Sequence, residues 1–186
     1  LIYNHGTLTT TTRFVRRAIE GTCTTPVYSN IIVVTVRPQL NGGTIGTDQT
    51  ICYGTDVAAF TSTNPASGGA GSFTYTWQYT TNTTIPAGDP AWINIPASNT
   101  VTYNYGTLTT TTRFIRRAVE GTCTTPVYSN EVKVTVRPEL NGGIIAGNQT
   151  ICSGGDVAAF TSTAAASGGA GSFTYTWQYT TNMSAT

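Results

Sequence analysis

The sequence predicts an all-β protein made of tandem sandwich units that repeat about every 100 residues. The residues GSFTYTWQYTTN stand at 71–82 and again at 171–182. With that offset, residues 1–86 match residues 101–186 at roughly three positions in four, which identifies a repeat protein. Threonine and glycine are frequent and runs of helix-forming residues are missing, a composition typical of strands with polar outer faces.

The repeat divides the chain into one complete unit and two half units. Asn-Gly-Gly follows RPQL and again RPEL, which indicates a linker between units. We therefore expect the C-terminal half of a unit at 1–40, a complete unit at 41–140 and the N-terminal half of the next unit at 141–186. With the strands of a unit lettered A to G, the first half carries strands E–G and the second carries strands A–C.

Short strands are expected along the complete unit, separated by turn-forming residues at the spacing of a β-sandwich. In order, they are Thr44–Cys52, Val57–Thr63, Ser72–Thr80, Ala91–Ile95, Thr100–Tyr105, Thr111–Glu120 and Asn130–Arg137.

The last strand is supported by a difference between the copies. Ile31 of the first copy is replaced by Glu131, whereas the neighbouring Ile32 stays apolar as Val132. A charge tolerated beside a retained apolar residue predicts a strand with one solvent-exposed face and one buried face.

The third strand, FTYTWQY, is predicted to be the core strand. Phe73, Tyr75, Trp77 and Tyr79 alternate with polar residues and fall on one face, where each ring can bury ~150–250 Å². The second copy repeats the core prediction at Phe173, Tyr175 and Trp177.

The sixth strand, RFIRRAVE, is less regular. Phe114 lies on one face and Ile115 on the other, with arginines on both. Either a β-bulge near Arg116-Arg117 shifts the phase, or neighbouring elements cover both faces.

Charge and motifs argue against catalysis and several kinds of partner. Only 9% of residues are charged and the net charge is +1, so no basic surface is available for nucleic acid. No apolar run reaches the roughly 20 residues that span a bilayer, and no signal peptide is visible. The single histidine, His5, is replaced by Tyr105 in the second copy, which leaves no Ser-His-Asp or Cys-His set. We expect no enzyme activity, no cofactor and no metal site.

The cysteines follow the repeat, two in each unit. They are Cys23, Cys52, Cys123 and Cys152. Because no CxxC spacing occurs, disulfides in an oxidising extracellular setting are favoured over zinc, with small buried thiols as the alternative.

A buried tryptophan in the third strand, with cysteines before strand two and after strand six, resembles an immunoglobulin-type sandwich. The motifs QTIC, SGGAGSFTYTWQ, W-x-N-I-P at Trp92–Pro96, YNYGTLTTTTRFIRRAVEGTC and SNEVKVTVRP follow in order. Together they resemble the Ig-like repeats of very large cell-surface proteins of Bacteroidota, including gliding-type adhesins exported by the type IX secretion system. The resemblance covers the whole chain and implies tandem immunoglobulin-like units in an extracellular stalk or fibre with a structural or adhesive role.

The cysteines depart from the antibody pattern, in which they lie inside the strands. Here Cys52 precedes the second strand and Cys123 follows the sixth, at opposite ends of such a sandwich. Bridged cysteines need Cα atoms within about 7 Å. Two arrangements stay open: a bridge within one unit of altered topology, or a bridge across the junction between consecutive units.

Two further kinds of side chain are candidates for a contact surface. Trp92 is interpreted either as a ring that stacks on a sugar or as a side chain that packs at the edge of the core. The arginines form a basic stripe that is interpreted as solvated or ion-paired, with ligand binding as the alternative. This stripe consists of Arg113, Arg116 and Arg117.

The leading hypothesis is a structural or adhesive repeat segment of a secreted surface fibre, and the alternatives are a carbohydrate-binding array or an accessory region of a secreted enzyme. The half units would expose apolar faces and unpaired edges. We expect further copies of the repeat to complete them, either along the same chain or from a neighbouring molecule as in donor-strand assembly. Surface glycans are a further possible partner under these alternatives.

Overall fold

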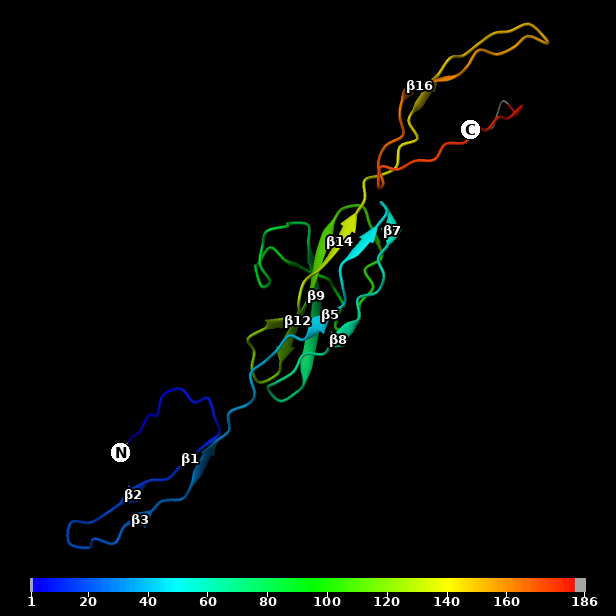
Figure 1. Cartoon of the computed structure of the whole chain (residues 1–186). Helices are drawn as coiled ribbons and strands as arrows, with labels where there is room; N and C mark the ends of the chain where they lie inside the picture. The colour runs from blue at the N-terminus through cyan, green and yellow to red at the C-terminus, as the bar shows by residue number, and fades with distance from the viewer. Residues whose placement is uncertain (1, 183–186) are drawn as a thin grey trace.

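A computed structural model describes residues 2–182, and these residues form strands and no helix. The all-β prediction is confirmed. The chain is elongated, with a two-layered central unit between two open end segments (Figure 1).

The first layer of the central unit is a sheet in the order β10, β9, β12, β14, β6, with β13 also paired to β12. These strands are β10 (Ile93–Asn94), β9 (Phe73–Thr80), β12 (Thr112–Glu120), β14 (Val132–Val136), β6 (Gln49–Ile51) and β13 (Val127–Tyr128). Only β14 and β6 run parallel. The order β9–β12–β14 is that of strands C, F and G in an immunoglobulin-type sandwich. The expected strand at 91–95 forms as the short edge strand β10.

The second layer is built on the stretch 55–64. At one end of that stretch, β8 (Ser62–Asn64) pairs with β5 (Thr44–Ile45). At the other end, β7 (Thr55–Asp56) pairs with β11 (Thr107–Leu108), and Phe60 bridges to Tyr103 between them. The expected strand at 100–105 is therefore present mainly as this single bridge.

The core lies between the two layers and is centred on Trp77. Its ring stacks against Phe60 and Tyr103, with centroids 5.6 and 5.9 Å away. Its Nε1 donates to the carbonyl oxygen of Thr100 at 2.9 Å, so the one polar atom of the ring is satisfied. Phe73 and Tyr75 lie on the same face of β9 and are half-buried.

Strand β12 has both faces covered. Its register against β9 runs without a shift from Arg113, opposite Thr80, to Glu120, opposite Phe73. The bulge alternative is therefore wrong. Ile115 is buried on the face away from the core, so neighbouring elements cover both faces of this strand.

The end segments are hairpins without a second layer (Figure 1). In the N-terminal segment, β1 (Thr12–Phe14) pairs with β4 (Ile32–Val34), and β2 (Arg17–Ala18) pairs with β3 (Val27–Tyr28). In the C-terminal segment, β15 (Ile144–Ala146) pairs with β16 (Thr161–Ala164).

The predicted core positions of the second copy are not buried in this chain. Tyr175 and Trp177 are exposed, so the core prediction is wrong for these two residues in the structure described. Phe173 is half-buried, as its counterpart Phe73 is. The physical reason is that the strands which cover Tyr75 and Trp77 have no counterparts in the C-terminal segment.

Candidate functional site

The two junctions between units are bonded in the same way. Asn41 and Ser67 exchange backbone hydrogen bonds of 2.9 and 3.0 Å, and the amide of Gly69 donates to the Pro38 carbonyl at 2.9 Å. The second junction repeats these bonds, with Asn141, Ser167, Gly169 and Pro138 in the same places. Each linker is held by backbone hydrogen bonds at its proline and at its asparagine, which restricts the rotation of one unit relative to the next.

Glycines let the linker approach the loop SGGAG closely. A methyl group on Gly68 would overlap the carbonyl oxygen of Gln39, and one on Gly69 would contact the Leu40 side chain. Both glycines have positive φ, at 91° and 56°, which side-chain-bearing residues rarely adopt. The loop SGGAG is thus shaped to receive the linker of the preceding unit.

Glu120 closes the first junction from the end of β12. Its Oε1 accepts from the Ala70 amide at 3.3 Å and lies 3.8 Å from the Arg37 guanidinium. Its Oε2 accepts from the amides of Cys123 at 2.7 Å and Thr122 at 3.0 Å. One buried carboxylate therefore ties together the linker, the loop SGGAG and the turn that follows β12.

These bonds lower the pKa of Glu120, with the Cys123 amide the largest cause. The same turn in the N-terminal segment lowers the pKa of Glu20 to about 2, chiefly through the Thr22 hydroxyl. Because Glu20 is exposed, the turn forms its carboxylate bonds by itself. The contacts with Arg37 and Ala70 are the additional part that belongs to the junction.

Glu120→Gln is expected to loosen the first junction. The folded-state pKa lies below 4.5, so the carboxylate's contribution is fully present above pH 4.5 and is lost as the pH falls through the folded-state value. The protection factors of the Ala70, Thr122 and Cys123 amides, which are exchange rates corrected for the intrinsic rate at each pH, should fall in the variant, and in the wild type as the pH falls through that value.

Glu20→Gln is the matched control, since it alters the same turn where no junction is present. Its effect should stay within the N-terminal segment. Unchanged protection at Ala70 in Glu120→Gln would contradict the role given to this carboxylate.

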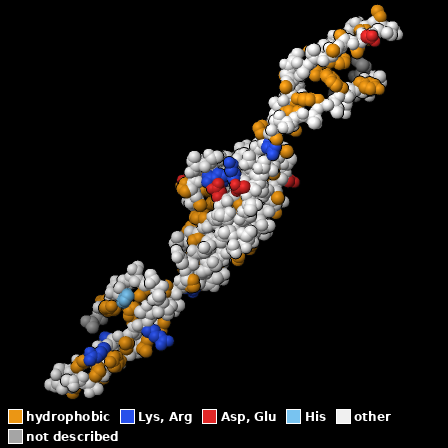
Figure 2. All heavy atoms as spheres, viewed as in Figure 1, with side chains coloured by type: hydrophobic (Ala, Val, Ile, Leu, Met, Phe, Trp, Pro, Cys, Tyr) orange, Lys and Arg blue, Asp and Glu red, His pale blue; other side chains and the backbone are white. Residues whose placement is uncertain are grey.

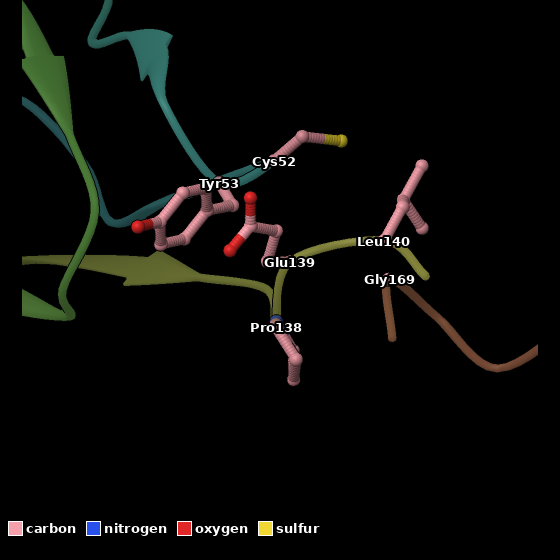
Figure 3. Close-up of a pocket in the computed structure, with 6 residues that line it drawn as sticks. All are labelled: Cys52, Tyr53, Pro138, Glu139, Leu140 and Gly169. Atoms are coloured by element: carbon pink, nitrogen blue, oxygen red, sulfur yellow. The ribbon is translucent and has the colours of Figure 1, made fainter. Parts of the chain in front are cut away.

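The four cysteines are free thiols in the structure. Cys52 is exposed beside the second junction, in a small hollow that Tyr53, Pro138, Glu139, Leu140 and Gly169 complete. Figure 3 shows its thiol on the same side as the Leu140 side chain. Cys123 lies in the turn beyond the far end of β12, beside the first junction.

This placement excludes a bridge between Cys52 and Cys123 of one unit. Ile51 pairs with Val136, at the end of β14 that lies beyond Thr112, whereas Cys123 follows Glu120. The length of β12 separates them, on the order of 25 Å, and a disulfide needs Cα atoms within about 7 Å. The alternative of a bridge within one unit is therefore wrong.

Trp92 is part of the packing, since only 4% of the residue is exposed. Its Nε1 donates to the Pro86 carbonyl at 2.8 Å, and the Arg113 guanidinium lies 5.4 Å from its ring centroid. The ring offers no open face for a sugar, so the contact-surface interpretation of Trp92 is wrong.

Arg113 is held in place by the same loop. It donates two bonds to the Glu131 carboxylate and further bonds to the carbonyls of Asn82 and Ile85 at 2.8 and 3.1 Å. The hydrogen bonds to Glu131 raise its pKa further. These contacts make Arg113 a tie between β12, β14 and the loop after β9, and the ion-pair interpretation is confirmed for this residue.

Arg116 is completely buried, which the sequence reasoning missed. Its guanidinium stacks 4.8 Å from the Tyr75 ring centroid and donates to Ser62 Oγ at 2.8 Å. It also donates to the carbonyls of Val101, Gly42 and Asn64. Arg117 is half-buried. The arginines therefore do not form a solvated stripe, because neighbouring elements cover both faces of β12.

Residues 2–182 hold no cluster of three or more His, Cys, Asp or Glu side chains suited to a metal ion. No helix in the same range is long and apolar enough to cross a membrane.

Comparison with known proteins gives a family for the central unit. Residues 41–138 match a family described as a domain of unknown function, DUF8696. The search of curated proteins gave no match.

Proposed function

We propose that this chain, which belongs to the DUF8696 family of domains of unknown function, is a non-catalytic structural or adhesive segment of an extracellular surface fibre. The observation that carries the proposal is that the same backbone hydrogen bonds recur at both junctions. A joint whose backbone bonds recur places each unit in a similar relation to the one before it. Repetition of such a joint generates a rod.

The construction of the joint supports stiffness. Glycine-rich linkers are ordinarily flexible, but here Gly68 and Gly69 are packed against the preceding Gln39 and Leu40. The carboxylate of Glu120 adds a third tie at the first junction. The elongated outline in Figure 2 agrees with a segment whose role is to span distance.

The resemblance of the repeat motifs to Ig-like repeats of Bacteroidota surface proteins supports an extracellular location and export by the type IX system. Antibodies against the central unit should label intact cells of the source organism. Labelling confined to permeabilised cells would contradict the location.

Gly68→Ala tests the stiff joint. The new methyl group overlaps the Gln39 carbonyl, so the linker must leave the loop. We expect small-angle X-ray scattering to show a shorter mean dimension and a broader distribution of shapes, while the central unit stays folded by circular dichroism.

Gly71→Ala is the matched control. Its φ of 85° is as unfavourable for alanine as the 91° of Gly68, but nothing lies within 4 Å of the added methyl group. It should therefore share the backbone strain without opening the joint. An equal change in both variants, or in neither, would contradict the proposed rod.

A further inference from the structure

The chain enters the central unit at one end and leaves it at the other (Figure 1). The entering linker, 38–41, is held by the backbone bonds of the first junction, and the leaving linker, 138–141, by those of the second. Tension along the chain therefore pulls residue 41 and residue 138 in opposite directions. The strands beside these linkers, β5 with β6 on one side and β14 on the other, receive that load first.

Strands β6 and β14 lie side by side and run parallel, with Gln49 opposite Val134 and Ile51 opposite Val136. The other strand pairs of the described residues are antiparallel. When the start of one parallel strand and the end of its neighbour are pulled apart, the two strands slide along each other. The hydrogen bonds between them then carry the load together and do not break one after another from an end.

We infer that the contact between residues 45–51 and residues 130–137 is a force-bearing clamp that keeps the central unit folded under tension. This inference deepens the proposed function and rests on it, since a fibre that spans distance carries load between its ends. The clamp lies within the central unit and needs nothing beyond the two linkers through which the load arrives.

Side-chain oxygens extend the clamp to positions where the two backbones do not pair. The Asn130 Oδ1 accepts from the Ile45 amide at 2.7 Å, and the Asp48 Oδ1 accepts from the Lys133 amide at 2.8 Å. Beyond β6, the Arg137 amide donates to the Ile51 carbonyl at 2.9 Å. Bonds between the two segments therefore occur from Ile45 to Ile51, and sliding loads all of them at once.

Strand β6 is also anchored to the second layer. The Gln49 side chain exchanges two hydrogen bonds with the backbone of Ala58, at 2.9 and 3.0 Å. Ile51 and Val136 are half-buried and pack against the core, so the paired strands are partly shielded from water. Hydrogen bonds in such a partly buried setting are electrostatically stronger than bonds in water.

The residues that form the clamp recur between the copies of the repeat. The stretch QTI of β6 stands again at 149–151, and VTV at 134–136 stands also at 34–36. Asn30 matches Asn130, and Asn148 replaces Asp48 with a side chain that still carries an acceptor oxygen. The outer position of Glu131, by contrast, is isoleucine in the first copy. Every unit of the repeat can therefore form the same clamp.

The first test pulls the full chain by its two ends at constant force in magnetic tweezers under reducing conditions. Unfolding of the central unit appears as an abrupt lengthening of at most about 350 Å. Asn130→Ala and Asp48→Ala each remove one acceptor of the clamp. Each should accelerate unfolding under force about 2- to 10-fold, the factor expected when one lost hydrogen bond would have broken in the rate-limiting step.

Asn99→Ala is the matched control. The Asn99 Oδ1 accepts from the Tyr75 amide of β9 at 2.7 Å, so the bond has the same kind and length as that of Asn130 with Ile45. Strand β9 is attached to neither linker, and the unfolding rate under force should not change. Equal acceleration by Asn99→Ala and the clamp variants would overturn the clamp, as would a clamp variant that unfolds like the wild type.

The second test changes the direction of pulling. One handle is attached to the exposed thiol of Cys52, directly after β6, and the other to the C-terminus, in a chain that carries Cys23→Ser, Cys123→Ser and Cys152→Ser. Both attachments load the same end of the parallel pair, because Cys52 lies beside Pro138. The bonds should then break one by one, and the unit should unfold at a lower force than when this chain is pulled by its two ends.

Equal unfolding forces in the two directions would overturn the clamp. None of these outcomes bears on the stiff joint, which the Gly68→Ala and Gly71→Ala pair tests by scattering. They also leave the extracellular location untouched, because antibody labelling of intact cells tests it separately. A failed clamp and a failed fibre are therefore distinguished by different measurements.

Discussion

Trp77→Ala is expected to lower the free energy of unfolding of the central unit by about 3–5 kcal/mol, the range for deleting a buried aromatic ring. The ring is fully buried, stacks on Phe60 and Tyr103, and donates to the Thr100 carbonyl. Its loss leaves a cavity between the layers and an unpaired carbonyl group. Urea denaturation followed by circular dichroism measures the difference.

Trp177→Ala is the matched control within the same chain, since the residue occupies the same place in the repeat and is 65% exposed. Trp177→Ala should leave the unfolding of the central unit unchanged. A loss of less than about 1 kcal/mol for Trp77→Ala would contradict the placement of the ring at the centre of the core.

The strands of the central unit could be predicted because the internal repeat provides a comparison between two copies. The change from Ile31 to Glu131 marks the outer face of β14, and the retained Val132 marks the inner face. Alternation in FTYTWQY likewise places Trp77 in the core. Both patterns depend only on side chains alternating across a strand, which holds whatever packs against it.

The arginines could not be placed in the same way, because their burial depends on residues distant in the sequence. Arg116 lies on the core face of β12. Its buried guanidinium is compensated by hydrogen bonds to acceptors on Ser62, Gly42 and Val101. Arg113 is covered by the loop that carries Trp92. A pattern of charges on one strand does not reveal which acceptors the other strands supply.

The contacts at the junction could be predicted only in part from the sequence. The linker Asn-Gly-Gly and the loop SGGAG are both visible as turn-forming sequences. Their contact, and the closure by Glu120, join three stretches of the unit through tertiary packing. Periodicity within one strand carries no information about such a contact.

Arg116→Ala is expected to destabilise the central unit by about 3 kcal/mol, because hydrogen bonds to a charged group contribute roughly 1.5–3 kcal/mol each and are not additive. The substitution removes the donors to Ser62 and to three backbone carbonyls. It also leaves space beside the Tyr75 ring. In the described part of the chain the Arg116 Nε is buried without a partner, so the guanidinium is not fully satisfied even in the wild type.

Arg116→Met separates packing from hydrogen bonding. Methionine fills much of the same volume with an apolar side chain, so it restores the packing on Tyr75 but leaves the carbonyls without donors. Its destabilisation should fall between the wild type and Arg116→Ala. Arg16→Ala, at the exposed counterpart, should leave the unfolding of the central unit unchanged.

The order of these variants decides what Arg116 does for the fold. If Arg116→Met has the same free energy of unfolding as the wild type, the Arg116 side chain stabilises the fold by packing alone. Its hydrogen bonds to the second layer then contribute nothing to stability. If Arg116→Met is as unstable as Arg116→Ala, the hydrogen bonds to Ser62, Val101 and Asn64 determine the stability, because both substitutions remove their donor. An Arg116→Ala variant as stable as the wild type would contradict the buried position of the guanidinium between the two layers.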